Sequence, residues 1–447
     1  MPTVTVAGAH GQVVSLTFDT ASNAAIAQKL AAAITAGVQN GSILPAVDTD
    51  GTPPAVPGGK IGEWVQTHAG TTILPHGYKA VVDTAPDSII FGSGDNGESI
   101  LSSVGDLTFI ATSGSGTVVA GGGDNRIVLF SSDKGPWSIN TGKGDDTIIA
   151  QNTGNDTINA GGGHNSILLG SGKDIVLSTG DDTVTAASGQ ETISATGKHS
   201  DLVYGNASNL FFVTDLGSAT IVGGSGSDTF IGGTGPDLVY GGTGGHNFLM
   251  AGTGAATLFG GGNGDLLIGN GNKSQALHAG AGNETLLGGM GGDTFFGSAG
   301  STQIIGGFGA DTYVAGTGAA TITSGFTSNL FEFTNGQAGG TESIQGFLSG
   351  RDHIDLQGYG KNEVNNALKS QHQTAGGDVI TLSDNTTITF AGVSSLTASD
   401  FVTSPGSASG SDPVSGNPGN GNNGHHGHAD SNDHSHIRNS TLPDHHG

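Results

Sequence analysis

Acidic residues recur in this sequence within a nine-residue pattern that is rich in glycine. Residues 223–240 read GGSGSDTFIGGTGPDLVY, two consecutive copies of the pattern G-G-x-G-x-D-x-U-x, in which U is a large apolar residue. Two further intact copies, GGMGGDTFF and GGFGADTYV, occupy residues 288–296 and 306–314. Carboxylate and backbone carbonyl oxygens are the ligands that Ca²⁺ prefers. Because this nonapeptide is typical of a Ca²⁺-binding parallel β-roll, the pattern predicts several calcium sites.

A single turn of this kind offers one carboxylate and a few carbonyls, fewer than the six to eight oxygens that Ca²⁺ takes. Two turns that lie 18 residues apart stack on one edge of the roll, so together they supply enough ligands. Asp293 with Asp311 is the best such pair, followed by Asp156 with Asp174 and by Asn247 with Asp265. The candidate metal-binding residues are Asp146, Asp156, Asp174, Gly223, Gly226, Asp228, Gly232, Gly235, Asp237, Asn247, Asp265, Glu284, Gly288, Gly291, Asp293, Gly306, Gly309 and Asp311.

The acid position also has an interpretation without a metal, in which each Asp only accepts hydrogen bonds from local backbone amides. This alternative is strongest in degenerate copies, such as those around Asp182, Glu191 and Asp201. Asn replaces the acid at Asn125, Asn165, Asn209, Asn247 and Asn329, and small residues replace it at Ala219, Ala256, Thr302 and Ala320. We therefore expect several bound ions rather than one for every turn. The phase of the pattern is lost only around residues 269–278, where we expect a protruding loop.

The apolar position persists where the acid does not, and it must face the interior between two parallel sheets. Its expected members are Phe230, Val239, Phe248, Leu258, Leu267, Leu286, Phe295, Ile304, Tyr313, Ile322 and Phe331. Side chains alternate along a strand, so positions seven and nine should point outward. Position nine is also apolar, as at Ile231, Tyr240, Leu249, Phe259, Ile268, Leu287, Phe296, Ile305 and Val314. Either it forms an exposed association surface or it turns inward at the corner, and the exposure of Phe259 and Phe296 distinguishes the two.

The predicted fold class is all-β, a parallel β-roll or β-solenoid of nonapeptide repeats with smaller units at both ends. Residues 1–85 are expected to form a small α+β domain, with a hairpin around residues 9–11 and a helix over residues 22–36 that ends at Gly37. Residues 86–333 form the roll. Residues 334–403 form a β-rich cap with a hairpin that turns at residues 383–385, and residues 404–447 form a disordered tail.

Composition excludes several functions. Asp and Glu outnumber Lys and Arg by 38 to 13, which gives a net charge of −25 and argues against nucleic-acid binding. There are no cysteines, so disulfides and thiolate metal sites are excluded. The first residues lack the pattern of a cleaved signal peptide, and no apolar stretch is long enough for a transmembrane helix.

The intact copies, together with the segments IQGFLSGRDHIDLQGYG and VITLSDNTTITFAG, resemble the RTX (repeats-in-toxin, haemolysin-type) calcium-binding family of Gram-negative bacteria. The resemblance covers roughly residues 90–403. It implies secretion by type I machinery through an uncleaved C-terminal signal. It also implies a chain that stays unfolded in the cytosol and folds outside the cell when Ca²⁺ binds. Many turns have lost the acid, which sets this chain apart from the family's pattern.

No enzyme motif accompanies the repeats. H-E-x-x-H and G-x-S-x-G are both absent, so the zinc protease and the lipase are excluded. The predicted function is a secreted, non-enzymatic protein of an extracellular matrix, biofilm or surface layer that self-assembles or adheres to a surface. Three alternatives stay open: a polysaccharide epimerase or lyase on the solenoid, an ice-binding protein and a polysaccharide-binding adhesin.

The C-terminal tail is rich in histidine, which is a ligand for Zn²⁺ or Ni²⁺. The alternative is a solvating tail that becomes charged at mildly acidic pH. The histidines concerned are His425, His426, His428, His434, His436, His445 and His446.

Overall fold

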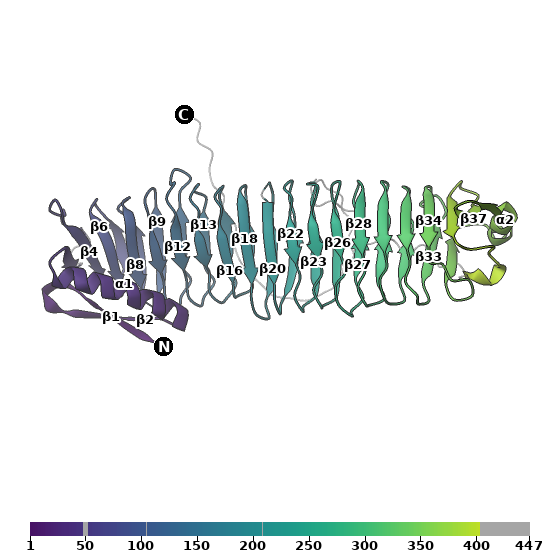
Figure 1. Ribbon diagram of the computed structural model, residues 1–447. Coiled ribbons are helices and arrows are strands. Elements are labelled where there is room, and N and C mark those ends of the chain that lie inside the picture. The colour runs from purple at the N-terminus through teal and green to yellow at the C-terminus, as the bar shows by residue number, and fades with distance from the viewer. Residues whose placement is uncertain (48–51, 104, 208, 403–447) are drawn as a thin grey trace, which may run out of the picture. The chain divides into compact units, whose positions relative to one another are not determined.

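A computed structural model describes residues 1–47, 52–103, 105–207 and 209–402. These belong to one compact unit, Met1–Ser404, in which parallel strands stack side by side along a solenoid (Figure 1). The histidine-rich tail predicted to bind Zn²⁺ or Ni²⁺ lies outside the described residues. None of the helices in the described part of the chain has the length and apolar character that a membrane crossing requires.

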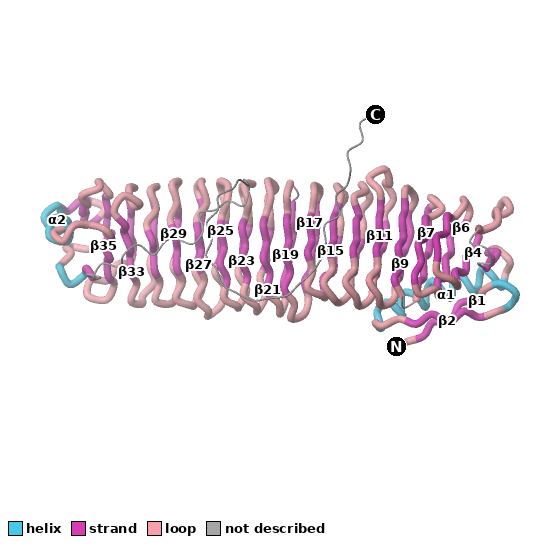
Figure 2. Tube along the Cα trace, turned by 180° about the vertical axis from the view of Figure 1, so that it is seen from behind, coloured by secondary structure: helices cyan, strands magenta, loops and turns pink. Residues whose placement is uncertain are grey.

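From β4 to β35, successive strands alternate between two parallel sheets, so each of these coils contributes one strand to each sheet. The strands follow one another along the solenoid in Figure 2. The first sheet contains β3 (Ile43–Val47), β4 (Ile61–Gln66), β6 (Tyr78–Asp83), β8 (Asn96–Ser102), β10 (Ser115–Val119), β12 (Trp137–Asn140), β14 (Thr157–Asn159), β16 (Ile175–Ser178), β18 (Gln190–Ala195), β20 (Asn209–Thr214), β22 (Thr229–Ile231), β24 (Phe248–Met250), β26 (Leu266–Ile268), β28 (Glu284–Leu287), β30 (Thr302–Ile305), β32 (Ala320–Thr323), β34 (Thr341–Gln345) and β38 (Thr387–Ala391). The second sheet contains β5 (Gly70–Ile73), β7 (Asp87–Phe91), β9 (Asp106–Ala111), β11 (Arg126–Leu129), β13 (Thr147–Ala150), β15 (Ser166–Leu169), β17 (Thr183–Thr185), β19 (Ser200–Tyr204), β21 (Ser218–Val222), β23 (Asp237–Tyr240), β25 (Ala256–Phe259), β27 (Ala276–His278), β29 (Thr294–Phe296), β31 (Thr312–Val314), β33 (Leu330–Thr334), β35 (His353–Gln357) and β39 (Phe401–Val402).

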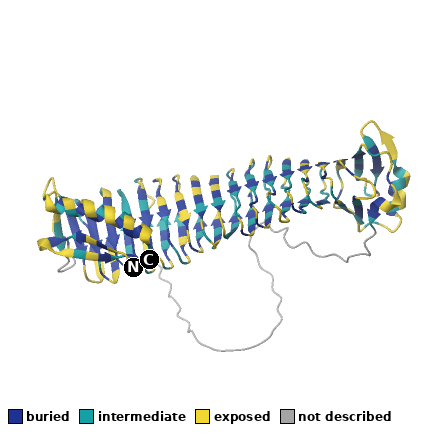
Figure 3. Cartoon of the chain, turned by 60° about the horizontal axis from the view of Figure 1, so that its bottom comes forward, coloured by how far each residue is buried: buried dark blue, intermediate teal, exposed yellow. Residues whose placement is uncertain are grey.

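The core is a narrow stack of apolar side chains between the two sheets. Figure 3 colours each residue by its burial, and buried residues, in dark blue, recur in the strands along the solenoid. Strands one coil apart pair in parallel and in register, so that Phe295 pairs with Tyr313 and Tyr313 with Phe331. The rings of these three residues stack with centroids 5.3 and 4.8 Å apart, close to the usual spacing of neighbouring strands. The predicted β-roll is therefore confirmed.

The strand ladder extends beyond the segment that was predicted to form the roll. It begins at β3 and β4, inside the predicted N-terminal domain, where Trp64 and Tyr78 fill the interior. It ends at β38 and β39, inside the predicted cap, which pair with β34 and β35. The coils therefore cross the predicted boundaries at residues 85 and 333. The first coils are filled by large aromatic side chains and lack the Gly-Asp turns by which the roll is recognised in the sequence.

An N-terminal cover packs on the outer face of the first sheet. It consists of the antiparallel strands β1 (Thr3–Ala7) and β2 (Val13–Thr17), the short 3₁₀ turn Ala9–Gly11, and helix α1 (Ala21–Gln39). The hairpin lies where it was predicted. The helix continues past Gly37, contrary to expectation, because Gly37 serves packing: a Cβ there would lie 2.5 Å from the Cδ1 atom of Ile43.

Polar contacts fix this cover to the turns of the solenoid. The buried Asn23 side chain donates from Nδ2 to the carbonyl oxygens of Ala120 and Thr141, at 3.0 and 2.8 Å. Asp19 accepts a hydrogen bond from the backbone N–H of Lys143 at 2.6 Å. The cover therefore joins two successive coils.

The C-terminal end is closed by an antiparallel extension of the first sheet. Strands β36 (His372–Thr374), β37 (Gly377–Thr381) and β38 pair in antiparallel order, and the turn between β37 and β38 confirms the predicted hairpin. Helix α2 (Glu363–Ser370) covers β37, and the 3₁₀ turn Ala398–Asp400 leads into β39. The helix was not expected from the sequence.

The structure corrects the repeat phase at two places. Leu249 is buried in the core while Phe248 and Met250 face outward, so Phe248 does not belong to the inward column. In the segment 269–278, Leu277 pairs in register with Leu258 and Phe295, so the predicted loss of phase there is wrong. At Phe248 the alternation was concealed because the neighbouring residues are also apolar. In the segment 269–278 it was concealed because Gln275 stands at the position of the acid.

The corrected phase predicts unequal effects of two neighbouring substitutions. Leu249→Ala removes a fully buried side chain and should destabilise the protein by about 2–5 kcal/mol. Phe248→Ala should cost less than Leu249→Ala, because the Phe248 side chain lies on the outer face and is only partly buried. Thermal unfolding in saturating Ca²⁺ measures both. A larger effect of Phe248→Ala would restore the original assignment.

Glu63 predicts a pH dependence of the N-terminal end. It lies on the face of β4 that carries Val65, whose side chain packs against the N-terminal cover, and it is fully buried without a hydrogen-bond partner for either carboxylate oxygen. Burial raises the pKa of Glu63 from its usual 4.5 to about 8. The folded state therefore retains a proton that the unfolded state has lost, so stability falls as pH rises from about 4.5 to about 8. Thermal unfolding over this range should show a flatter pH profile for Glu63→Gln than for the wild type. Identical profiles would contradict the assignment.

Candidate metal centre in the stacked turns

The sixth position of each nonapeptide, where the acid stands, forms a ladder that runs along the solenoid. In this inner ladder, the side-chain oxygen of one coil accepts the backbone N–H of the sixth residue one coil earlier. Asp293 N donates to Asp311 Oδ1 at 2.9 Å, and Asp156 N donates to Asp174 Oδ1 at 2.8 Å. Two rows of such turns exist, a first row that precedes the strands of the first sheet and a second row that precedes those of the second sheet. Asp228 lies in the first row and Asp237 in the second, on different edges as expected.

Asparagine and glutamine perform the same task in this ladder. Asp311 N donates to Asn329 Oδ1, Asp228 N to Asn247 Oδ1, and Ala256 N to Gln275 Oε1. Gln275 is thus a ladder member that the sequence analysis missed, because neither an acid nor Asn marks the position. Asn209 was assigned to the ladder in error. Its neighbour Leu210 occupies the sixth position, and its N–H donates to Asp228 Oδ1.

In turns without a side-chain acceptor at position six, a backbone carbonyl accepts the N–H of the preceding coil. Where Ala256 stands, the N–H of Asp237 donates to the carbonyl oxygen of Ala255 instead, at 3.2 Å. Thr302 and Ala320 show the same pattern: the N–H of the preceding coil's sixth residue reaches the carbonyl of Ser301 or Ala319. The oxygen at position six is therefore replaceable, whereas a partner for the buried N–H is required.

The second oxygen of many ladder carboxylates has no hydrogen-bond partner. Buried and unpartnered Oδ2 atoms belong to Asp146, Asp156, Asp174, Asp182, Asp228 and Asp237. Burial raises the pKa of Asp156 and Asp237 to about 7 and that of Asp174 to about 6. A buried, unneutralised carboxylate is unfavourable, so these oxygens fit a bound cation that accepts oxygen ligands.

The glycines at the start of each turn make room for this oxygen. A Cβ atom on Gly223 would lie 2.4 Å from Asp228 Oδ2, and one on Gly306 would lie 2.6 Å from Asp311 Oδ2. The fourth-position glycine serves the stacking of coils: Gly309 has a φ of 128°, and a Cβ there would meet Gly291 O at 1.9 Å. Each turn is thus a cradle that a side chain would fill.

The predicted pairs differ in whether their second carboxylate oxygens are already hydrogen-bonded. Asp156 and Asp174 each keep one buried oxygen without a partner. In the pair that the sequence placed first, Asp293 Oδ2 accepts the N–H of Gly289 at 2.8 Å, and Asp311 Oδ2 lies 3.4 Å from the hydroxyl of Tyr313. The two oxygens of Asp265 accept the N–H groups of Asn247 and Gly261.

Three further positions complete this comparison. Glu284 is buried, and its Oε1 accepts the N–H of Gly282 within its own turn at 2.7 Å. Glu342 occupies the sixth position of the first row with both oxygens unpartnered, and burial raises its pKa to about 8. Asp352 continues the second row by accepting the N–H of Asn329 at 2.8 Å. The sequence analysis missed Glu342 and Asp352 because longer loops precede them.

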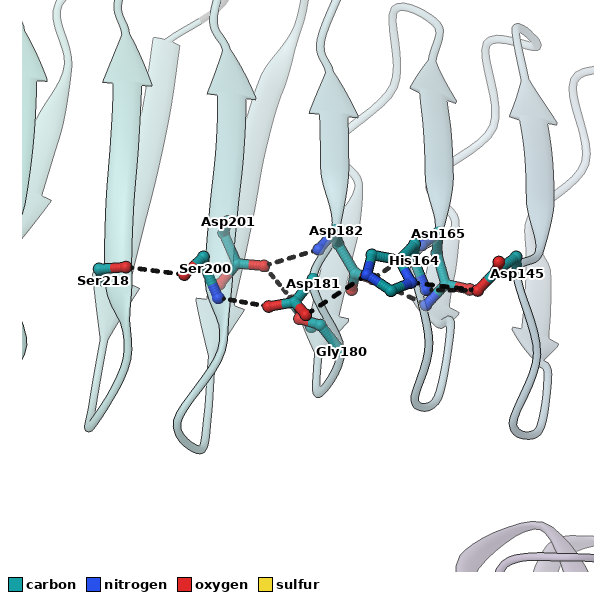
Figure 4. A network of polar contacts seen from close by, with 10 residues as sticks. Asp145, His164, Asn165, Gly180, Asp181, Asp182, Ser200, Asp201 and Ser218 are labelled. Atoms are coloured by element: carbon teal, nitrogen blue, oxygen red, sulfur yellow. Dashed lines mark hydrogen bonds and ion pairs between the residues drawn. The ribbon is translucent and has the colours of Figure 1, made fainter. Parts of the chain in front are cut away.

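An exposed outer row runs beside the second row of turns, at the fifth position (Figure 4). The N–H of His164 donates to Asp145 Oδ1 at 2.8 Å, and that of Ser200 donates to Asp181 Oδ1 at 2.7 Å. The imidazole of His164 lies between two carboxylates, 3.4 Å from Asp145 and 3.7 Å from Asp181. These contacts are exposed to water, so they contribute little to stability.

The composition of the turns limits the kind of metal. Within the described ranges, no three Asp, Glu or His side chains converge as a ready-made metal site. Each turn presents one carboxylate among backbone carbonyls, which is an all-oxygen environment assembled from successive coils. Such an environment suits a hard cation such as Ca²⁺ rather than Zn²⁺, which takes nitrogen and sulfur ligands.

Solenoids built from stacked Gly-Asp turns form a class of parallel β-rolls that take up cations between coils. Four segments of this chain, residues 140–176, 214–245, 276–295 and 287–322, match the RTX calcium-binding nonapeptide repeat. The resemblance seen in the sequence is confirmed: the chain carries calcium-binding nonapeptide repeats of the RTX type. A comparison with curated proteins finds no match.

A ladder carboxylate accepts a hydrogen bond with one oxygen and offers the other to a cation. Substitutions of Asp174 can separate these two roles. Asp174→Asn keeps the acceptor for the N–H of Asp156 but removes the charge, so we expect fewer bound Ca²⁺ ions without loss of stability in the Ca²⁺-free protein. Asp174→Ala also leaves the Asp156 N–H without its partner and should cost about 1–3 kcal/mol. Calorimetric Ca²⁺ titration and urea unfolding in chelator measure the two effects.

Asn165→Ala provides the matched control, because Asn165 accepts the N–H of Asp146 at 2.9 Å and has no charge to lose. It should lower stability equally with and without Ca²⁺. Equal destabilisation of the Ca²⁺-free protein by Asp174→Asn and Asp174→Ala would contradict the separation of tasks.

Proposed function

We propose that this protein is secreted and acts outside the cell as a non-enzymatic, Ca²⁺-stabilised structural protein that assembles with copies of itself. Among the residues predicted to bind metal, Asp146, Asp156, Asp174, Asp228 and Asp237 are the principal Ca²⁺ ligands, since each has a buried oxygen without a hydrogen-bond partner. Ca²⁺ from the extracellular medium then neutralises them and adds its binding free energy to the stability of the folded state. Secretion by type I machinery is the route that RTX repeats favour.

The observation that carries the proposal is the apolar character of the outer faces. On the second sheet, Tyr240, Phe259, His278 and Phe296 stack in one column, with ring centroids 4.7, 4.2 and 3.9 Å apart. Phe259 and Phe296 are half-buried rather than enclosed, so position nine does not turn into the core. This outcome supports an association surface over the alternative of an inward corner.

The first sheet carries a second apolar column on its outer face. It runs without interruption over six strands, and its members are Val213, Ile231, Met250, Ile268, Leu287 and Ile305. In the coils at either side of these six strands, polar residues occupy the same outward position, namely Ser194 and Thr323. Polar residues are therefore compatible with the fold at this position. A long, regular apolar face of this kind is typical of a contact between copies.

The proposal predicts Ca²⁺-dependent assembly that depends on this column. In Ca²⁺, sedimentation velocity should show larger species as protein concentration rises, whereas the double variant Ile268→Thr, Leu287→Thr should need at least about tenfold higher concentration. Ser194→Thr, in the same column, is the control and should assemble like the wild type. A wild-type protein that stays monomeric in Ca²⁺ at all accessible concentrations would contradict self-assembly.

A groove on the second sheet favours polysaccharide binding as a second candidate function. It has a volume of about 560 Å³ and crosses strands β21, β23, β25 and β27. Small side chains such as Thr220, Ala256 and Ser274 line it, and Asp237 is its one acidic lining residue. An uncharged, extended sugar chain fits such a lining. Retardation of a monomeric protein in gels that contain a neutral polysaccharide would favour this function over assembly.

A further inference from the structure

Three large apolar side chains protrude from consecutive turns of the second row. Met290, Phe308 and Phe326 stand at the third position of their turns, each 18 residues from the next. Their exposed fractions are 64%, 68% and 81%. Leu348 stands exposed in the turn that follows. We call Met290, Phe308 and Phe326 the apolar ridge.

The repeat itself does not require apolar residues at this position. Other turns of the second row carry Lys143, Thr234, Thr253 or Asn272 there, and Leu216, 45% exposed, stands there with polar residues in the turns that follow. From residue 153 onward, the same position in the first row holds small residues, among them Thr153, Ser171, Ser188, Ser225, Ala281, Ala299 and Thr317. The ridge therefore has a purpose that the fold does not explain, because exposed Phe and Met side chains are unfavourable in water.

The backbone holds the ridge in a straight line. The N–H of Met290 donates to Gly271 O at 2.8 Å, and that of Phe308 donates to Gly289 O at 2.9 Å, each one coil earlier. The guanidinium of Arg351 donates to the carbonyl oxygen of Phe326 at 2.7 Å. The three side chains thus stand in single file, one strand spacing of ~4.8 Å apart.

The ridge is too narrow for a stable contact with a folded protein. Three side chains exposed to this extent offer roughly 400 Å² of apolar surface, about half of what each partner contributes to a standard protein interface. Insertion into a lipid bilayer has no such requirement, because a few protruding Phe and Met side chains leave water completely once they enter the acyl region.

The charge around the ridge also favours a lipid surface. In the coils of the ridge, the outer row contains Gly292, Ala310, Ser328 and then Arg351, whereas its acids, Asp106, Asp124, Asp145 and Asp181, lie in the early coils. Although the chain carries a net charge of −25, this end of the edge presents a cation and no outer-row carboxylate. An anionic headgroup layer is thus least repelled here.

We propose that the apolar ridge inserts into the interfacial region of a lipid bilayer and places this edge of the solenoid against a membrane. The contact is independent of self-assembly, since the ridge lies on the turns rather than on the outer faces of the sheets. Arg351 pairs with lipid phosphate beside the ridge.

The test uses the full chain in saturating Ca²⁺ and vesicles of phosphatidylcholine with phosphatidylglycerol. The triple variant Met290→Ser, Phe308→Ser, Phe326→Ser should bind at least about a hundredfold more weakly in co-sedimentation. The control Phe211→Ser removes an exposed aromatic ring from the first sheet, 41% exposed, and should bind like the wild type. Circular dichroism with and without Ca²⁺ checks that all variants fold.

Insertion is measured directly with Phe308→Trp. Its fluorescence should shift to the blue on vesicle binding and be quenched by brominated lipids, against the constant background of Trp64 and Trp137, which are buried. Phe211→Trp should show neither effect. Vesicle binding without quenching of the residue-308 signal would overturn the proposal. Unchanged vesicle binding by the triple variant, or a loss of oligomers in place of vesicle binding, would overturn it as well.

Discussion

The solenoid depends on one hydrogen bond that is repeated in nearly every coil. The N–H at the sixth position of each turn is buried, and it needs an acceptor from the next coil. Asp174, Asn247 and Gln275 provide that acceptor with a side-chain oxygen. Where Ala256 cannot, a backbone carbonyl takes the oxygen's place. An oxygen atom is therefore the requirement of the fold, and a negative charge is an addition to it.

An affinity for cations follows from that addition. A ladder built from Asn would satisfy every N–H without a metal, as Asn165 and Asn329 do. Each Asp brings a second oxygen into the interior of the turn, where burial raises the carboxyl pKa, as at Asp156 and Asp237. Near neutral pH such a group must take up a proton or a cation. Since Asp and Asn alternate irregularly along both rows, the carboxylates that call for a proton or a cation are confined to particular coils, while the hydrogen-bonded stack continues through the others.

The inward column, the turn phase and the opposite placement of neighbouring acids were predictable because glycine spacing and hydrophobic alternation fix them together. Where two apolar residues adjoin, as at Phe248 and Leu249, hydrophobicity does not distinguish the inward one. The early coils escaped prediction because Trp64 and Tyr78 fill them without Gly-Asp turns. The hydrogen bonding of the candidate pairs could not be predicted from the sequence for a further reason. Whether the second oxygen of Asp293 or Asp174 is already hydrogen-bonded depends on the local turn geometry, which the shared motif does not specify.

The outer positions of the turns are free of these constraints, so their residues differ along the chain. On one edge, the early coils carry Asp145, His164 and Asp181, which form an exposed polar row. The late coils of the same edge carry Phe308 and Phe326 in turns whose backbone hydrogen bonds follow the same pattern. The inner ladder keeps the coils in register whichever residues stand outside it. Substitution at these outer positions therefore changes the surface of an edge without removing the hydrogen bonds that hold the coils in register. A polar end and an apolar end can thus coexist on one solenoid.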